Sequence, residues 1–118
     1  MTSLRQIVEE KKTGGWPHSP CVKLAYNDSP PCLRLEFCNG DQLLLPWARF
    51  VEACLDGETL TIEFHNRRIE ITGRNLDQVS DAIGDGKLAG LRELPPDYAA
   101  VSEGKPYVSA IRVEAVQD

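Results

Sequence analysis

Two short runs of alternating apolar and polar residues, at positions 60–64 and 69–72, constrain the fold most strongly. The apolar members share a spacing of two residues and are Leu60, Ile62 and Phe64 in the first run and Ile69 and Ile71 in the second. This spacing is typical of β-strands with one buried face. Because only a few polar residues separate the runs, we expect them to form a β-hairpin.

The register of this hairpin follows from keeping its apolar side chains on one face. Pairing Phe64 with Ile69 achieves this, and a slip of one residue would turn one strand's apolar set toward water. The expected loop is 65–68, or only its inner pair 66–67. The same register places Glu63 opposite Glu70 on the solvent face, where like charges repel. Either the two carboxylates contact Arg68 or a basic side chain of a neighbouring strand, or they meet a cation or a basic partner surface.

A second hairpin is predicted around Asn39 and Gly40, which separate two leucine-rich runs. A two-residue turn would scatter the leucines between the two faces. A three-residue loop that ends on Gly40 in the left-handed region keeps them together and is the geometry we expect. It pairs the alternating leucines of the two strands, Leu33 with Leu45 and Leu35 with Leu43.

A helix is predicted after the second strand of the 60–72 hairpin. Asn75 is a suitable N-cap and Gln78 can complete a capping box. Leu76, Val79 and Ile83 recur at helical spacing, so we expect this helix to cover the apolar face of the sheet.

The remaining segments predict shorter elements. Helical turns are expected at 3–12, 88–94 and 97–102, and strands at 21–26 and 107–116. In the last strand, Tyr107, Ile111 and Val113 form the apolar side and Arg112 and Glu114 the polar side. The segment 47–55 favours a short helix, with an extended continuation as the alternative.

These elements predict one α+β domain over residues 1–118. Its core is a largely antiparallel sheet of about five strands, made of the two hairpins and the C-terminal strand, with short helices packed on one face. The formal charge of −5 and the pI near 5.0 argue against a nucleic-acid-binding surface. The N-terminus lacks the apolar core of a signal peptide and no stretch is long enough to span a bilayer, so we expect a cytoplasmic protein with no membrane contact.

The sequence contains no recognisable catalytic or metal-binding pattern. The four cysteines form no CxxC pair and match no zinc spacing, so we predict no metal and no cofactor. Cys38 and Cys54 have no sequence neighbour that would activate a thiol. No catalytic residue is predicted, and the pattern favours a protein that is not an enzyme.

A basic group near the 60–72 hairpin is the candidate for ligand contact. It consists of His65, Arg67, Arg68 and Arg74, and Arg74 lies close to a predicted helix N-terminus, which favours anions. The plainer interpretation is a solvated hairpin tip, with Arg74 paired to an acidic neighbour.

Two tryptophans complete the candidate contacts. Trp16 and Trp47 suit an interface because tryptophan buries much apolar area at low entropic cost, although each could instead plug the end of the sheet. Together with Glu63 and Glu70, they suggest a non-catalytic interaction or regulatory module that self-associates as a homo-oligomer. The alternative is a small-molecule or anion-binding domain that uses the arginines, with or without weak enzymatic activity.

Overall fold

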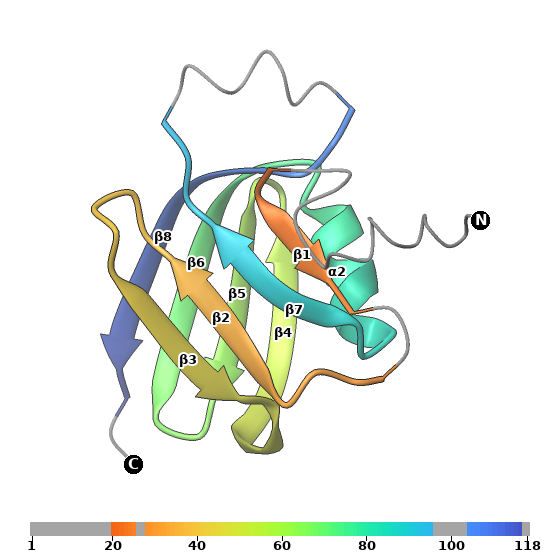
Figure 1. Ribbon diagram of the computed structural model, residues 1–118, viewed down its shortest axis with the longest axis vertical. Coiled ribbons are helices and arrows are strands. Elements are labelled where there is room, and N and C mark those ends of the chain that lie inside the picture. Colours follow the sequence, from red (N-terminus) through yellow and green to blue (C-terminus); the bar gives the residue numbers. More distant parts are fainter. Residues whose placement is uncertain (1–19, 26–27, 96–103, 117–118) are drawn as a thin grey trace, which may run out of the picture.

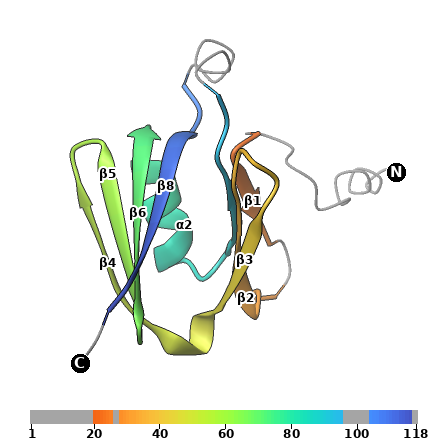
Figure 2. The ribbon, with the colours of Figure 1, turned by 90° about the vertical axis from the view of Figure 1, so that its left-hand side faces the viewer.

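The computed structural model describes residues 20–25, 28–95 and 104–116, which form eight strands and one α-helix. The strands make two four-stranded sheets that face each other as the layers of a β-sandwich (Figure 1, Figure 2). The predicted combination of a dominant sheet with some helix is present. The layout differs, because a second sheet covers the apolar face that the short helices were expected to cover.

The first sheet has the order β1-β7-β2-β3. Its strands are β1 (Val22–Leu24), β2 (Cys32–Glu36), β3 (Gln42–Pro46) and β7 (Leu88–Arg92). The predicted β2–β3 hairpin is confirmed, with Leu33 opposite Leu45, Leu35 opposite Leu43, and Gly40 at φ 96°. β7 runs parallel to β2 and antiparallel to β1, so this sheet is mixed.

The second sheet has the order β4-β5-β6-β8 and is antiparallel throughout. Its strands are β4 (Phe50–Asp56), β5 (Thr59–Phe64), β6 (Arg67–Arg74) and β8 (Tyr107–Ala115). A single 3-10 turn, η1 (Trp47–Arg49), carries the chain from β3 to β4. As predicted, Tyr107 and Ile111 of β8 are buried while Arg112 and Glu114 are exposed.

The predicted register of the β5–β6 hairpin is wrong by two residues. Ile62 lies opposite Ile69 and Phe64 opposite Arg67, so the loop contains only His65 and Asn66. A shift of two residues leaves the same side chains on the buried face, and for that reason the apolar pattern alone did not distinguish the two registers. Glu63 therefore faces Arg68, and the predicted opposition of Glu63 and Glu70 does not occur.

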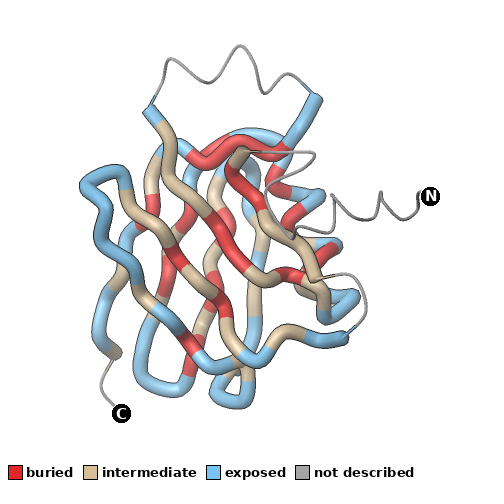
Figure 3. The backbone as a smooth tube through the Cα atoms, viewed as in Figure 1, coloured by how far each residue is buried: buried red, intermediate tan, exposed pale blue. Residues whose placement is uncertain are grey.

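The helix α2 (Asp77–Gly84) closes one side of the sandwich, where it packs against β4 of one sheet and β7 of the other (Figure 1). Its predicted apolar stripe is buried at Leu76 and Val79. The predicted capping box is absent, because the side-chain amides of Asn75 and Gln78 donate to the carbonyl oxygens of Lys105 and Gly104 instead. Buried residues run through the middle of both sheets, and the hairpin tips are exposed (Figure 3).

Two segments that were predicted as helical are strands with a β-bulge. The segment 47–55 forms η1 and β4, so its extended alternative is closer to the structure than the preferred helix, and the segment 88–94 contains β7. Val51 is the extra residue in β4 and Ala89 is the extra residue in β7. A bulge puts inward side chains three residues apart, as in Leu88 and Leu91, and this spacing imitates a helix. The helical turns predicted at 3–12 and 97–102 lie outside the described residues.

Candidate functional site

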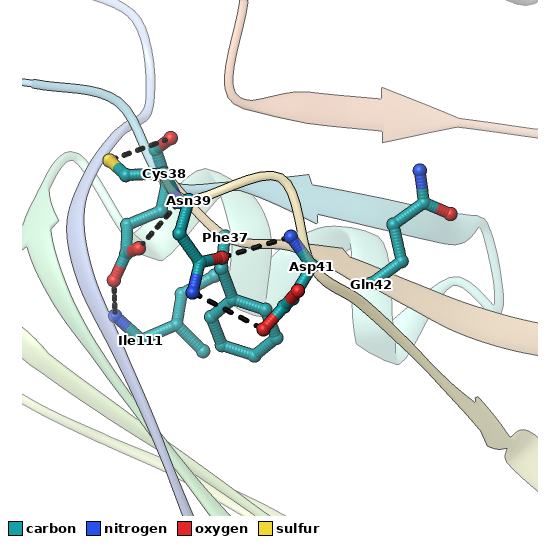
Figure 4. A pocket seen from close by; sticks show the side chains of 7 residues that line it. Phe37, Cys38, Asn39, Asp41, Gln42 and Ile111 are labelled. Carbon is teal, nitrogen blue, oxygen red and sulfur yellow. Dashed lines mark hydrogen bonds between the residues drawn. The ribbon is translucent and has the colours of Figure 1, made fainter.

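A pocket of about 610 Å³ lies between the β2–β3 turn and β8 (Figure 4). These two elements are on the side of the sandwich away from α2 (Figure 1). The lining side chains are two carboxylates, two amides, one thiol and two apolar groups, namely Glu93, Asp41, Asn39, Gln42, Cys38, Phe37 and Ile111. The lining contains no basic side chain and no histidine.

Glu93 lies just after β7 and ties the turn to β8. Its Oε1 accepts a hydrogen bond from the backbone N–H of Cys38 at 2.9 Å, and its Oε2 accepts one from the N–H of Ile111 at 2.8 Å. Bonds from N–H groups to an ionised carboxylate are stronger than bonds between neutral groups. Glu93 therefore links the β2–β3 turn of the first sheet to the edge strand β8 of the second.

The Cys38 thiol in this pocket is poorly suited to nucleophilic chemistry. Its Sγ lies 3.4 Å from the carbonyl oxygen of Glu93. Partial desolvation and then the negative charge of Glu93 raise the pKa of Cys38 above its ordinary value. A nucleophilic cysteine needs the opposite shift and a neighbouring base, and the only lining groups able to accept a proton are the two carboxylates.

On the Asp41 side of the pocket, the hydrogen bonds stay within the β2–β3 turn. The backbone N–H of Asp41 donates to Asn39 Oδ1 at 2.9 Å, and Asn39 Nδ2 donates to Asp41 Oδ2 at 3.2 Å. These bonds hold the three-residue loop in place, which is a structural role for both side chains.

The backbone groups of β8 divide into two sets. Residues of an antiparallel strand alternate between bonding to the neighbouring strand and pointing away from it. Val116 N–H donates to the carbonyl oxygen of Asn66, the loop residue directly before β6, at 3.0 Å, so the even-numbered residues after the bulge face β6. Ile111, Val113 and Ala115 therefore direct both N–H and C=O away from β6, toward the free edge of the sheet.

Half of this free edge is covered. Glu93 Oε2 binds the N–H of Ile111, and Leu94 N–H donates to Val108 O at 3.1 Å. Among the described residues, none bonds to the edge-facing groups of Val113 and Ala115. We call the segment Ile111–Ala115 the open edge of β8.

The other three strand edges carry features that block pairing. β1 is three residues long, and β3 is five residues long and ends in Pro46. β4 contains the bulge at Val51 and is flanked by α2. Short length, proline, bulges and covering helices each protect a sheet edge from adding a further strand. The open edge of β8 has none of them, since the bulge of β8 is at Ser109.

Glu63 and Glu70, which the sequence suggested as interface residues, lie on the outer face of the second sheet beside arginines. Glu63 Oε2 is 3.2 Å from Arg68 Nε, and Glu70 Oε1 is 3.5 Å from Arg112 Nη1. Arg112 also lies 3.3 Å from Glu114. The contact with Arg68 or a neighbouring strand's arginine was one of the two alternatives in the sequence, and it leaves no need for an external cation.

The structure does not bring the predicted basic group together. His65 lies in the β5–β6 loop beside Arg67 and Arg68, and Arg74 ends β6 at the opposite end of the sheet. At a strand rise of about 3.3 Å per residue, Arg67 and Arg74 are roughly 23 Å apart. Arg68 binds Glu63 and Glu114, and the Arg74 guanidinium lies 5.8 Å from the centre of the Tyr107 ring.

Trp47 plugs the end of the sandwich at the crossover from β3 to β4. Its Nε1 donates to Leu88 O at 3.0 Å, and its ring centre lies 5.3 Å from that of Phe50 and 5.5 Å from that of Phe64. This is the plug alternative that the sequence left open. Trp16 lies outside the described residues.

Sequence reasoning missed Glu93 and the open edge. Glu93 stands in a segment that was predicted as helical, and no local pattern marks a carboxylate that binds backbone groups 55 and 18 residues away. The sequence showed that apolar and polar residues alternate in β8, with Arg112 and Glu114 on one face. It did not show that β8 lies at the edge of a sheet.

Within the described residues, no three metal-ligating side chains gather into a group. The helical part of the same residues includes no segment with the length and apolar character needed to cross a membrane.

Comparisons with models of protein families, with curated proteins and with solved structures found no match to this chain.

Proposed function

We propose that this protein is a non-catalytic interaction module that binds a second copy of itself through the open edge of β8. One observation supports the proposal: Glu93 and Leu94 bind one half of the edge of β8, and no other described residue binds the half at Val113 and Ala115. Backbone groups on a bare edge are preformed partners for a further strand, and proteins commonly recognise each other in this way.

The chemistry of the pocket supports a non-catalytic role. Cys38 has a raised pKa. Both carboxylate oxygens of Glu93 accept hydrogen bonds from backbone N–H groups, and the Asp41 carboxylate accepts one from Asn39 in the same turn. The alternative of an anion-binding domain has weaker support, because Arg74 is separated from Arg67 and Arg68 by the length of β6.

The expected association is weak. A pairing of five residues per chain is a small contact, and contacts below about 1,000 Å² are usually transient. We therefore expect a monomer–dimer equilibrium with a dissociation constant on the order of micromolar to millimolar.

A proline at Val113 tests the proposal, because it removes the edge-facing N–H and leaves the bonds to β6 intact. In sedimentation equilibrium up to about 0.5 mM, the wild-type mass should rise above the 13.1 kDa protomer toward twice that value. The Val113→Pro variant should stay at the protomer mass.

Val113→Ala is the matched control, because it shortens the same side chain and keeps the N–H. It should still associate, and all three proteins should unfold at similar denaturant concentrations. A wild-type protein that remains at 13.1 kDa throughout, or a folded Val113→Pro variant that associates as strongly as wild type, would refute the proposal.

A further inference from the structure

We infer that the two copies pair antiparallel about a two-fold axis through Val113, which sets Arg112 of each copy opposite Glu114 of the other. This inference rests on the proposed function and specifies its geometry. It follows from the backbone alternation of β8, the charges beside Val113 and the position of Glu93.

The backbone limits the possible registers. Only Ile111, Val113 and Ala115 direct N–H and C=O groups toward the open edge, so a second β8 can bond only by placing odd-numbered residues opposite odd-numbered residues. A symmetric antiparallel pair of this kind is centred on a residue rather than between two residues. The centres that use the open edge are Arg112, Val113 and Glu114.

The charges on the outer face distinguish these three registers. A centre at Arg112 places the two Arg112 side chains opposite each other, and a centre at Glu114 does the same with two carboxylates. Like charges directly opposite are unfavourable and opposite charges are favourable. A centre at Val113 instead gives Arg112 opposite Glu114 twice, once on each side of the axis.

Glu93 disfavours the Arg112-centred register independently of charge. In that register half of the bonds between the copies are donated by Ile111 N–H, which Glu93 Oε2 already holds at 2.8 Å. The Val113-centred register loses only its outer bonds, those from Ile111 N–H to Ala115. In the Val113-centred register, the two Val113 residues exchange N–H and C=O bonds. The N–H of each Ala115 then donates to the free C=O of Ile111 across the interface.

The existing ion pairs of Arg112 do not prevent this arrangement. Its side chain is 69% exposed, and it lies 3.5 Å from Glu70 and 3.3 Å from Glu114 of its own chain. Exposed pairs of this kind contribute little to stability, so the guanidinium can turn toward the carboxylate of the other copy at small cost. On the inner face, Val113 meets its symmetry mate and partly buried apolar surface becomes covered.

Charge reversal tests the register. Arg112→Glu alone and Glu114→Arg alone each convert both cross-axis pairs into like-charge pairs, so each variant's dimer dissociation constant should rise about tenfold or more. An equimolar mixture of the two variants restores two opposite-charge pairs and should form a heterodimer about as tight as wild type. The mass of each sample in sedimentation equilibrium measures this directly.

The single variant Arg112→Glu separates the registers. Centres at Arg112 or Glu114 both predict that this variant associates as well as wild type. Arg49→Glu is the matched control for net charge, since Arg49 is exposed on η1, outside β8. It should associate like wild type.

The possible failures are distinguishable. Wild-type protein that does not self-associate refutes both the proposed function and the register. Association that Val113→Pro abolishes, but that charge reversal leaves unchanged or that mixing does not restore, refutes the Val113-centred register and leaves the proposed function standing. Loss in both single variants and recovery in the mixture supports both.

Discussion

At the scale of single residues, Gly73 shows how closely β6 and β8 approach each other. It lies where the β8 bulge shifts the register, opposite Val108. A Cβ atom at Gly73 would collide with the backbone carbonyl of Tyr107. The obstacle is main chain, so it cannot turn aside as a flexible side chain would. Glycine is therefore required here for space, without any positive φ.

We expect Gly73→Ala to lower the free energy of unfolding by about 1–3 kcal/mol, because β8 must move to admit the added methyl group. Denaturant unfolding monitored by tryptophan fluorescence measures the change. Gly84→Ala is the control, since nothing lies within 4 Å of a Cβ at this helical position. It should be neutral or stabilising by up to about 1 kcal/mol. Equal stability of Gly73→Ala and wild type would contradict the close approach.

Cys21 is the buried thiol of the core, and its burial has a pH consequence. The side chain is 0% exposed, and its Sγ accepts a hydrogen bond from Val108 N–H at 3.3 Å. Desolvation raises the pKa of Cys21 above its ordinary value of 9.0. In the unfolded chain the thiol ionises near that ordinary value, whereas in the folded protein it remains neutral to higher pH. Its contribution to stability is therefore complete below pH 9.0 and is lost as the pH rises above it.

The free energy of unfolding should accordingly decrease as the pH rises above about 9, and the decrease should be smaller in Cys21→Ala. Urea unfolding at a series of pH values makes the comparison. Cys54→Ala, at an exposed position, is the control and should follow wild type. Identical slopes for Cys21→Ala and wild type would show that the Cys21 thiol does not titrate differently in the two states.

At the scale of elements, the predictable strands are those that keep a period of two over most of their length. The β2–β3 hairpin was predicted with its loop and its pairs, because Gly40 marks the turn and the leucines alternate on both sides. β7 was predicted as helical, because its extra residue separates the inward Leu88 and Leu91 by three. A helix was preferred for the β4 segment because Phe50, Val51 and Cys54 recur at helical spacing, but Val51 and Cys54 are exposed in the structure. A bulge is stabilised by its neighbouring strands, so its signal is absent from the local sequence.

The edge of β8 is also an element-scale feature, and Glu93 limits its length. We expect Glu93→Ala to lower the free energy of unfolding by about 1–3 kcal/mol, because the N–H groups of Cys38 and Ile111 lose their acceptor. The freed Ile111 N–H then extends the open edge, so self-association should become stronger while stability decreases. Denaturant unfolding and sedimentation on the same samples separate the two effects.

Asp41→Ala serves as the control for this variant, since it removes the other pocket carboxylate, whose bonds are confined to the Asn39 turn. Its association should match wild type. Glu93→Ala protein that is less stable without associating more strongly would show that Glu93 only braces the sandwich.

At the scale of the whole molecule, the two sides of the sandwich between the sheets differ in what covers them. α2 closes one side, and the other side presents the pocket and the edge of β8. The sequence indicated a sheet with one apolar face and a helix with an apolar stripe, and pairing these two led to the predicted α+β layout. Instead, the two sheets cover each other, and the inner strand β7 of the first sheet carries a bulge and lies far along the chain from its neighbours β1 and β2.

The candidate site depends on the same long-range arrangement. The outward positions of Arg112 and Glu114 follow from alternation, and these residues were predicted on one face. Their location at a free edge follows only from the strand order, and Glu93 reaches β8 only because β7 returns to the first sheet. Neither fact has a local signal, since both result from contacts between segments distant in sequence.

The central position of β7 also determines when the first sheet can form. β1 and the β2–β3 hairpin are synthesised early, but the strand that lies between β1 and β2 is Leu88–Arg92. During synthesis on a ribosome, β4, β5, β6 and α2 must all emerge before this gap is filled. The edge of β2 that pairs with β7 therefore stays unpaired until then, and loop closure over the intervening residues slows completion of the first sheet. Assembly of this sandwich should begin with β4, β5 and β6, continue in the first sheet when β7 emerges, and end when β8 joins β6.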